Sequence, residues 1–186
     1  ILQMTDDISA AFHRVLYHPD MGPAFATVWK DYLIIPVSAI FGARDSPSNY
    51  MLRGELRSHF ANFMDIPPEA FDLDLVQRLQ LPAPPTAEEI ASFSAAAADT
   101  RNPGISTHEN GEPERRQPVF VDDAGNAQIY RWFMALVAAS VYSAYVLYGR
   151  PEEDPNRPPC INPEKWTERV FHHMQFLGYF IDTRKM

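Results

Sequence analysis

The sequence is short of cysteine, and its histidines show no metal-ligand pattern. Cys160 is the single cysteine among 186 residues, so the chain cannot form an internal disulfide. The 6 histidines have none of the spacings found in structural zinc sites. A reducing intracellular setting, in the cytoplasm or the nucleus, is therefore expected.

Basic residues are also scarce. Lys and Arg total 16 against 24 Asp and Glu, which gives a formal net charge of −8. Phosphate contacts need clustered Lys and Arg, so the composition argues against a self-sufficient nucleic-acid binder. Either the basic surface belongs to other parts of a longer polypeptide, or nucleic acid is not the ligand. An acidic balance is, however, what a carboxylate cage for divalent cations contributes.

Long apolar runs are missing as well. Residues 132–148 are apolar almost all round, but the run is shorter than the roughly 20 residues that a bilayer requires. It also contains Ser140 and Ser143, which favours a buried core helix. No signal segment opens the chain, so no association with a membrane is expected.

Alternation at the start of the chain predicts a half-buried strand over residues 1–5. Leu2 and Met4 share one face of this strand. Successive side chains point to opposite faces, so Asp6 continues the apolar face and Asp7 the polar one. Asp7 is therefore the acid expected to face a cleft.

The following segments predict further strands and a helix. Residues 24–40 are rich in β-branched and aromatic residues and predict two strands joined by a short turn. Residues 48–63 predict a helix, with Ser46 as its N-cap and Pro47 at its first position.

Residues 65–117 are different in character, with many prolines and few apolar stretches. Thr86 and Glu89 have capping-box spacing and predict a short helix through Ala98. We interpret this proline-rich segment as an insertion or an elaborated connection within one domain that spans residues 1–186.

Asp122 and Asp123 lie between an apolar run and a Gly-Asn turn signal, at the tip of a predicted hairpin whose second strand, within residues 124–129, must be brief. Adjacent aspartates are common in turns, where their carboxylates bond backbone groups, so the dipeptide alone favours a capped turn. Other segments of the chain change that interpretation.

Five segments follow one another in a fixed order: residues 7–12 (Asp-Ile-Ser-Ala-Ala-Phe), 41–47 (Phe-Gly-Ala-Arg-Asp-Ser-Pro), 120–123 (Phe-Val-Asp-Asp), 162–165 (Asn-Pro-Glu-Lys) and 175–178 (Gln-Phe-Leu-Gly). This ordered set resembles the palm of reverse transcriptases, the RNA-directed DNA polymerases of retrotransposon polyproteins. The resemblance covers most of residues 1–64 and 117–186 and leaves the proline-rich segment unexplained.

The resemblance implies a two-metal nucleotidyl transfer from a dNTP to a primer 3′-hydroxyl. Asp7 and Asp122 would bridge two Mg²⁺ ions, which Mn²⁺ could replace, with Asp123 beside them as a further metal ligand. Hard divalent cations prefer oxygen ligands, and a pair about 3.5–4 Å apart stabilises the attacking and leaving oxygens.

The resemblance also implies roles in substrate binding. Phe12 would stack beneath the sugar of the dNTP and exclude a 2′-hydroxyl, although an ordinary core aromatic is the alternative. Gly42 would let the backbone approach the nucleotide closely. Lys165 would sit near the leaving pyrophosphate as a catalytic residue, with an exposed loop lysine as the alternative.

Template and primer contacts complete the implied set. Ser46 and Pro47 belong to the template segment, and Arg44 would approach a template phosphate. Leu177 and Gly178 would position the primer end.

The fold class expected is α+β: a polymerase palm-like small antiparallel sheet backed by the helices over residues 48–63 and 130–148. The core between sheet and helices is expected to contain Leu2, Met4, Phe133, Leu136, Val137, Val141 and Tyr145. The implied partners are an RNA or DNA template with its primer, dNTPs and the remaining domains of the parent polyprotein.

The sequence contains no counterpart of the basic fingers strands, the thumb or a ribonuclease H domain. Both ends look cut, so we expect a fragment that is inactive in isolation. Two other hypotheses stay open. One is an inactive or domesticated palm remnant that binds nucleic acid or protein. The other is an unrelated α+β interaction domain, which predicts that Asp7 lies more than about 10 Å from Asp122 and Asp123, too far for paired ions.

Overall fold

The computed structural model describes residues 1–91, 114–115, 117–151, 156, 159–166, 170, 172–177 and 179–182. Its elements in chain order are β1 (Leu2–Asp7), η1 (Ala11–Arg14), η2 (Pro19–Phe25), β2 (Thr27–Trp29), β3 (Tyr32–Ile34), α1 (Ser46–Phe63), η3 (Pro68–Ala70), α2 (Asp74–Gln77), β4 (Val119–Phe120), β5 (Asp123–Gln128), α4 (Tyr130–Tyr148), β6 (His173–Phe176) and β7 (Tyr179–Asp182). Gly178 and the predicted helix beyond residue 91 lie outside the described residues.

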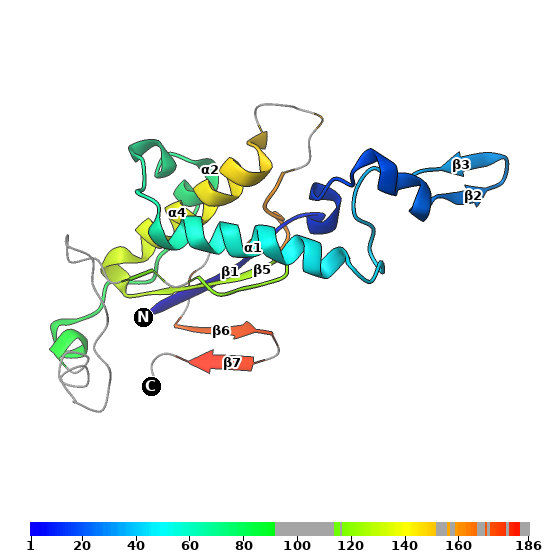
Figure 1. Cartoon of the computed structure of the whole chain (residues 1–186). Coiled ribbons are helices and arrows are strands. Elements are labelled where there is room, and N and C mark those ends of the chain that lie inside the picture. Colours follow the sequence, from blue (N-terminus) through cyan, green and yellow to red (C-terminus); the bar gives the residue numbers. More distant parts are fainter. Residues whose placement is uncertain are drawn as a thin grey trace.

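Small antiparallel sheets and helices form an α+β fold, as expected. The central sheet has the strand order β1-β5-β4, and β1 pairs with β5 from Leu2↔Gln128 to Asp7↔Asp123. Helices α1 and α4 cover one face of this sheet, and the β6–β7 hairpin lies on the other side of β1 (Figure 1). The sheet therefore forms the middle of three layers, and the C-terminal end of β1 meets the start of β5.

Strand β1 is buried on both faces. Leu2 and Met4 pack into the core on the helix side, as predicted. Gln3 points the other way but is only 2% exposed, and its Nε2 donates to the carbonyl of His172 at 3.0 Å. The prediction of a half-buried strand was wrong because the segment that enters β6 covers the face expected to meet solvent.

Helix α4 is buried because other elements surround it. It packs against α1, β5, α2 and η3. Within the described residues, no helix is long and apolar enough to cross a membrane. The predicted core residues are all buried: Leu2, Met4, Phe133, Leu136, Val137, Val141 and Tyr145.

Helix α1 begins differently from the prediction. Asp45 takes the cap position, without a capping hydrogen bond from its side chain, and Ser46 is already helical. The Ser46 hydroxyl donates to the carbonyl of Ile40 at 2.8 Å. Ser46 is therefore not the N-cap, because its side chain ties the preceding loop to the helix instead.

The proline-rich segment contributes to the core in its first part. Ala70 and Val76 are buried with the core residues, and their elements η3 and α2 contact α4. The predicted capping box is confirmed: Glu89 Oε2 accepts from the Thr86 backbone at 2.7 Å, and Thr86 Oγ1 accepts from the Glu89 backbone at 3.2 Å.

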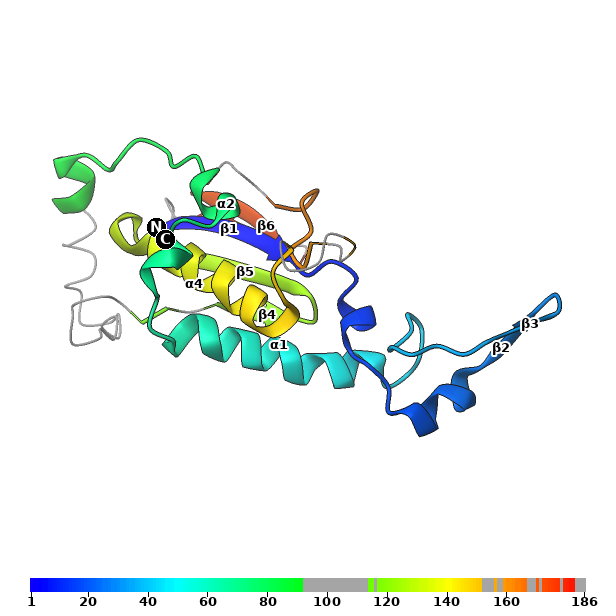
Figure 2. The same cartoon turned by 90° about the horizontal axis from the view of Figure 1, so that it is seen from above.

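Strands β2 and β3 confirm the hairpin predicted within residues 24–40, with Lys30 and Asp31 in its turn. The hairpin projects from the body of the molecule as an arm (Figure 2). All 3 residues of each strand are exposed, which is unusual for such apolar segments.

Candidate functional site

The Asp122–Asp123 dipeptide lies at the tip of a hairpin, as predicted. Strand β4 ends at Phe120, Val121 and Asp122 form the turn, and Asp123 begins β5. The prediction that the second strand is brief was wrong, because β5 has 6 residues and β4 only 2. Strand β5 is long because it pairs with the whole of β1 as well as with β4.

The turn has a strained backbone. Val121 has φ 57°, in the left-handed region that β-branched residues rarely adopt. Such a conformation costs on the order of 1–3 kcal/mol and persists only where the surroundings enforce it. Val121 directly precedes Asp122, so this unusual backbone conformation belongs to the turn that carries Asp122.

Helix α1 supports the turn through Gly54. A Cβ atom at Gly54 would lie 3.1 Å from the carbonyl oxygen of Val121 and 3.2 Å from Cγ1 of Val119. A larger residue would require the helix and the turn to separate by a few tenths of an ångström. Gly54 therefore helps to set the height of the aspartate turn above the helix.

The first predicted acid lies beside this turn. Asp7 and Asp123 are opposite each other in the β1–β5 register, and the amide of Ile8 donates to the carbonyl of Asp122 at 3.1 Å. Asp7 Oδ1 and Asp123 Oδ1 lie 2.8 Å and 3.8 Å from the same nitrogen of Lys165. An unrelated domain is expected to place Asp7 more than about 10 Å from the turn. Asp7 and Asp123 are closer than that, because both contact the same nitrogen.

The Asp7 carboxylate is only 5% exposed and is held by two side chains. Lys165 Nζ donates to Oδ1 at 2.8 Å, and Asn162 Nδ2 donates to Oδ2 at 3.2 Å. The Asn162 amide also donates to the Asp7 carbonyl at 2.8 Å. The turn that carries Lys165 is thus fastened to β1 at Asp7.

Asn162 is a residue to which the sequence interpretation gave no role. Its Oδ1 accepts from the backbone of Glu164 at 3.0 Å, which is the turn geometry that asparagine favours. The only signal in the sequence is an asparagine before Pro163, a common way to start a turn.

The pKa values of Asp122 and Asp123 are shifted by their surroundings at the tip of the hairpin. Partial burial raises the pKa of both Asp122 and Asp123, and the nearby charge of Asp7 raises it further. Lys165 opposes this effect on both acids. The hydrogen bond to Asp7 raises the pKa of Lys165, which keeps the ammonium charged.

The three acids do not form a ready-made metal cage. Across the described ranges, no three His, Cys, Asp or Glu side chains are grouped so that they could hold a metal ion. The carboxylate oxygens suit Mg²⁺ chemically, but both oxygens of Asp7 already accept hydrogen bonds from Lys165 and Asn162. The arrangement as it stands is a cluster of carboxylates whose negative charge is offset in part by one lysine.

Asp6 points into the helix layer and has a different role from Asp7. Arg57 Nη2 donates to its Oδ1 at 2.6 Å, and Ser140 and Asn126 donate to its Oδ2 at 2.7 Å and 3.0 Å. The side chains of Asp6 and Arg57 are fully buried. Asp6 is therefore the anchor that joins β1 to α1, α4 and β5, and only Asp7 reaches the carboxylate cluster.

Two predicted nucleotide-binding residues, Phe12 and Gly42, each have a structural explanation within the fold. Phe12 lies in η1, and its ring centroid is 6.0 Å from those of Phe41 and Tyr50. This packing is that of a partly buried core aromatic. Gly42 has φ 91° and open space where a Cβ would be, so its backbone conformation explains the glycine.

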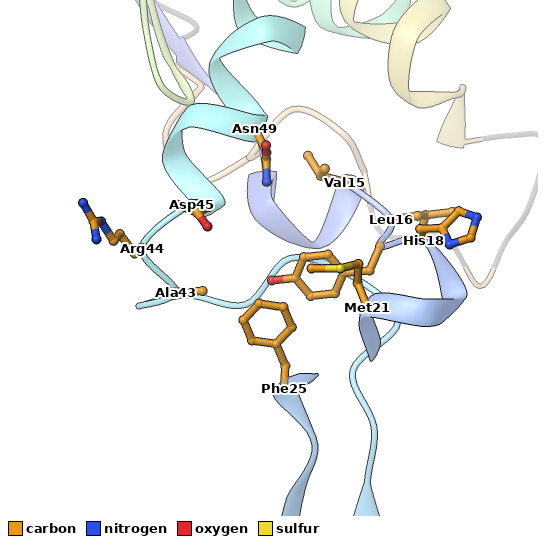
Figure 3. A pocket seen from close by; sticks show the side chains of 10 residues that line it. Val15, Leu16, His18, Met21, Phe25, Ala43, Arg44, Asp45 and Asn49 are labelled. Carbon is orange, nitrogen blue, oxygen red and sulfur yellow. The ribbon is translucent and has the colours of Figure 1, made fainter. Parts of the chain in front are cut away.

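A hollow of about 460 Å³ lies beside the predicted template segment rather than at the acids (Figure 3). It is lined by Val15, Leu16, Tyr17, His18, Met21, Phe25, Ala43, Arg44, Asp45 and Asn49. The rings of Tyr17 and Phe25 stack at 4.8 Å. Its lining includes one acid, Asp45, whereas Asp7 and Asp123 lie together at the ends of β1 and β5.

The predicted primer segment forms a hairpin. Leu177 lies in the turn between β6 and β7, with φ 50°. Phe176 packs beneath the central sheet, where its ring would be 3.5 Å from a Cβ at Gly125. The hairpin is thus docked on the sheet that carries Asp7 and Asp123.

Comparison of the chain with protein-family models and with curated proteins gives no match in either case. The resemblance to reverse transcriptases therefore rests on the motif residues alone.

Proposed function

We propose that the chain is the palm of a retroelement reverse transcriptase, an RNA-directed DNA polymerase that transfers nucleotides from dNTPs to a primer 3′-hydroxyl. The observation that carries the proposal is the pairing of Asp7 with Asp123 across β1 and β5, with Lys165 between their carboxylates. The motifs that suggest the activity are far apart in the sequence, and these three residues meet at one point.

The proposed chemistry assigns a role to each of these residues. Asp7, Asp122 and Asp123 would hold two Mg²⁺ or Mn²⁺ ions, which when bound would stabilise the charge of the reacting phosphate. Lys165 carries an ammonium on an exposed turn, where it can meet the triphosphate or the leaving pyrophosphate. Phe12 would pack beneath the sugar of the nucleotide.

Substrate strands would lie on either side of this centre. Ser46 and Pro47, at the start of α1, would follow the template together with Arg44. The β6–β7 hairpin would present the primer end through Leu177 and Gly178. The partners proposed are the template with its primer, dNTPs, and the fingers, thumb and ribonuclease H domains of a polyprotein.

Primer extension tests the proposal. The chain, fused to the fingers and thumb of a reverse transcriptase, should extend oligo(dT) on poly(rA) with dTTP in the presence of Mg²⁺. Asp7→Asn and Asp122→Asn should each lower the rate by at least about a hundredfold, since each removes charge from the reaction centre. Full activity in either variant would show that the assignment of the acids is wrong.

The arrangement also favours a second candidate, an inactive palm remnant that binds nucleic acid or protein. The observation behind it is that Lys165 is paired with Asp7 and that, in the part of the chain with a described structure, the acids are not grouped for a metal. A fused protein that binds primer and template but never extends the primer would support this candidate.

A further inference from the structure

The Lys165 ammonium lies close to both Asp7 and Asp123. Its Nζ lies 2.8 Å from Asp7 Oδ1 and 3.8 Å from Asp123 Oδ1. An ammonium is a compact charge that satisfies a carboxylate much as a metal ion would. The side chain therefore supplies, from within the protein, one positive charge between the two acids.

Binding of a divalent cation to Asp7 is unfavourable while the Lys165 ammonium stays beside the same carboxylate. An ion bound to Asp7 Oδ1 would lie within a few ångströms of the ammonium, and two positive charges at such a distance repel each other strongly where water is partly excluded. The Asp7 carboxylate is almost wholly buried, so screening by solvent is weak on its side of the contact.

Lys165 is free to move away, whereas its turn is fixed. The Lys165 side chain is 55% exposed, so its four-carbon stem can swing into solvent. The turn itself stays attached to β1 through the two hydrogen bonds from Asn162 to Asp7. Departure of the ammonium would leave Asp7 Oδ1 open without unfolding the site.

We infer that Lys165 is a built-in competitor of the divalent cation: the acids bind Mg²⁺ or Mn²⁺ only when the ammonium leaves Asp7. The inference rests on the proposed function, because it assumes that these acids hold the catalytic ions. The phosphates of a nucleotide offer Lys165 a new anionic partner when it leaves, which would couple metal binding to nucleotide binding.

Binding of Mn²⁺ to the 186-residue chain, measured by electron paramagnetic resonance, tests the inference. Lys165→Met removes the ammonium and keeps most of the length of the side chain. Lys30→Met is the matched control, because Lys30 lies at the tip of the β2–β3 arm over Trp29 and its loss changes the net charge by the same amount. Circular dichroism establishes that each variant is folded.

Lys165→Met should bind Mn²⁺ at least about tenfold more tightly than the unmodified chain, whereas Lys30→Met should not. Adding Asp7→Asn to Lys165→Met should abolish the gain. Equal affinity in Lys165→Met and the unmodified chain would overturn the inference and leave the proposed function standing. If no variant binds Mn²⁺ through Asp7, both the inference and the metal-dependent function fail.

Discussion

Asp6 and Asp7 are adjacent, but their Asp→Asn substitutions should have very different effects on stability. The chemical change is the same at both positions, so any difference reports on the surroundings of each side chain. Asp6 and Arg57 form a fully buried ion pair. Asp6→Asn removes the negative charge and leaves the guanidinium buried without a counter-ion, a change that typically costs about 3–5 kcal/mol. Two nitrogens of Arg57 already lack a hydrogen-bond partner, so the guanidinium has little other compensation.

Asp7→Asn should have a much smaller effect on stability. Its partner Lys165 is half exposed, and ion pairs with such a partner contribute about 0–1 kcal/mol. The substitution also removes a negative charge next to Asp122 and Asp123, which offsets part of that loss. Asp7→Asn should therefore change the free energy of unfolding by less than about 1 kcal/mol.

Urea and thermal unfolding of both variants, followed by circular dichroism near neutral pH, give the comparison. In a domain of this size 1 kcal/mol shifts Tm by about 2–4 °C, so Asp6→Asn should lower Tm by roughly 10 °C and Asp7→Asn by only a few degrees. Equal destabilisation by the two variants, or a neutral Asp6→Asn, would refute the assignment of Asp6 as the structural anchor.

Three further predictions concern the neighbourhood of the site. Gly54→Ala should lower stability by at most about 2 kcal/mol, because a gain of about 1 kcal/mol in helix propensity offsets part of about 1–3 kcal/mol of overpacking against Val121. Primer extension should fall as the turn shifts, and unchanged extension would contradict this role of Gly54. The raised pKa of Asp122 means that the folded state binds this proton more tightly than the unfolded state, so stability should fall as pH rises from 3.8 through the raised pKa. Asp122→Asn should flatten that part of a urea-midpoint profile, and a profile identical to that of the unmodified chain would contradict the assignment. In the fused polymerase, Arg44→Ala should weaken binding to primer and template and reduce the salt slope by about 1, whereas an unchanged slope would exclude a phosphate contact.

Local patterns were enough to predict several elements. The alternation at Leu2 and Met4 predicts β1, the even apolarity of residues 132–148 predicts α4, and the Asp122–Asp123 turn marks the hairpin. In each case the signal depends on a few neighbouring residues. The choice of Asp7 over Asp6 also came from the two-residue period of a strand, and the structure confirms that the two side chains point to opposite sides.

Contacts between distant segments were not predictable in the same way. The face of β1 that carries Gln3 was expected to meet solvent, but a segment about 170 residues later covers it. Nothing near Arg57 in the sequence indicates that its partner is Asp6. Asn162 belonged to a recognised motif, yet its hydrogen bonds to Asp7 exist only because the fold brings the turn to the end of β1.

Cleavage of the chain by iron(II) with hydrogen peroxide and ascorbate tests the central claim most directly, because iron(II) can take the place of Mg²⁺ and reduces the peroxide to radicals where it is bound. If the ends of β1 and β5 form one metal-dependent centre, cleavage should occur near Asp7, Asp122 and Lys165 together, and Mg²⁺ should suppress it at all three places. Asp7→Asn should abolish the whole pattern. Cleavage that is absent, or that persists unchanged in Asp7→Asn, would contradict the account.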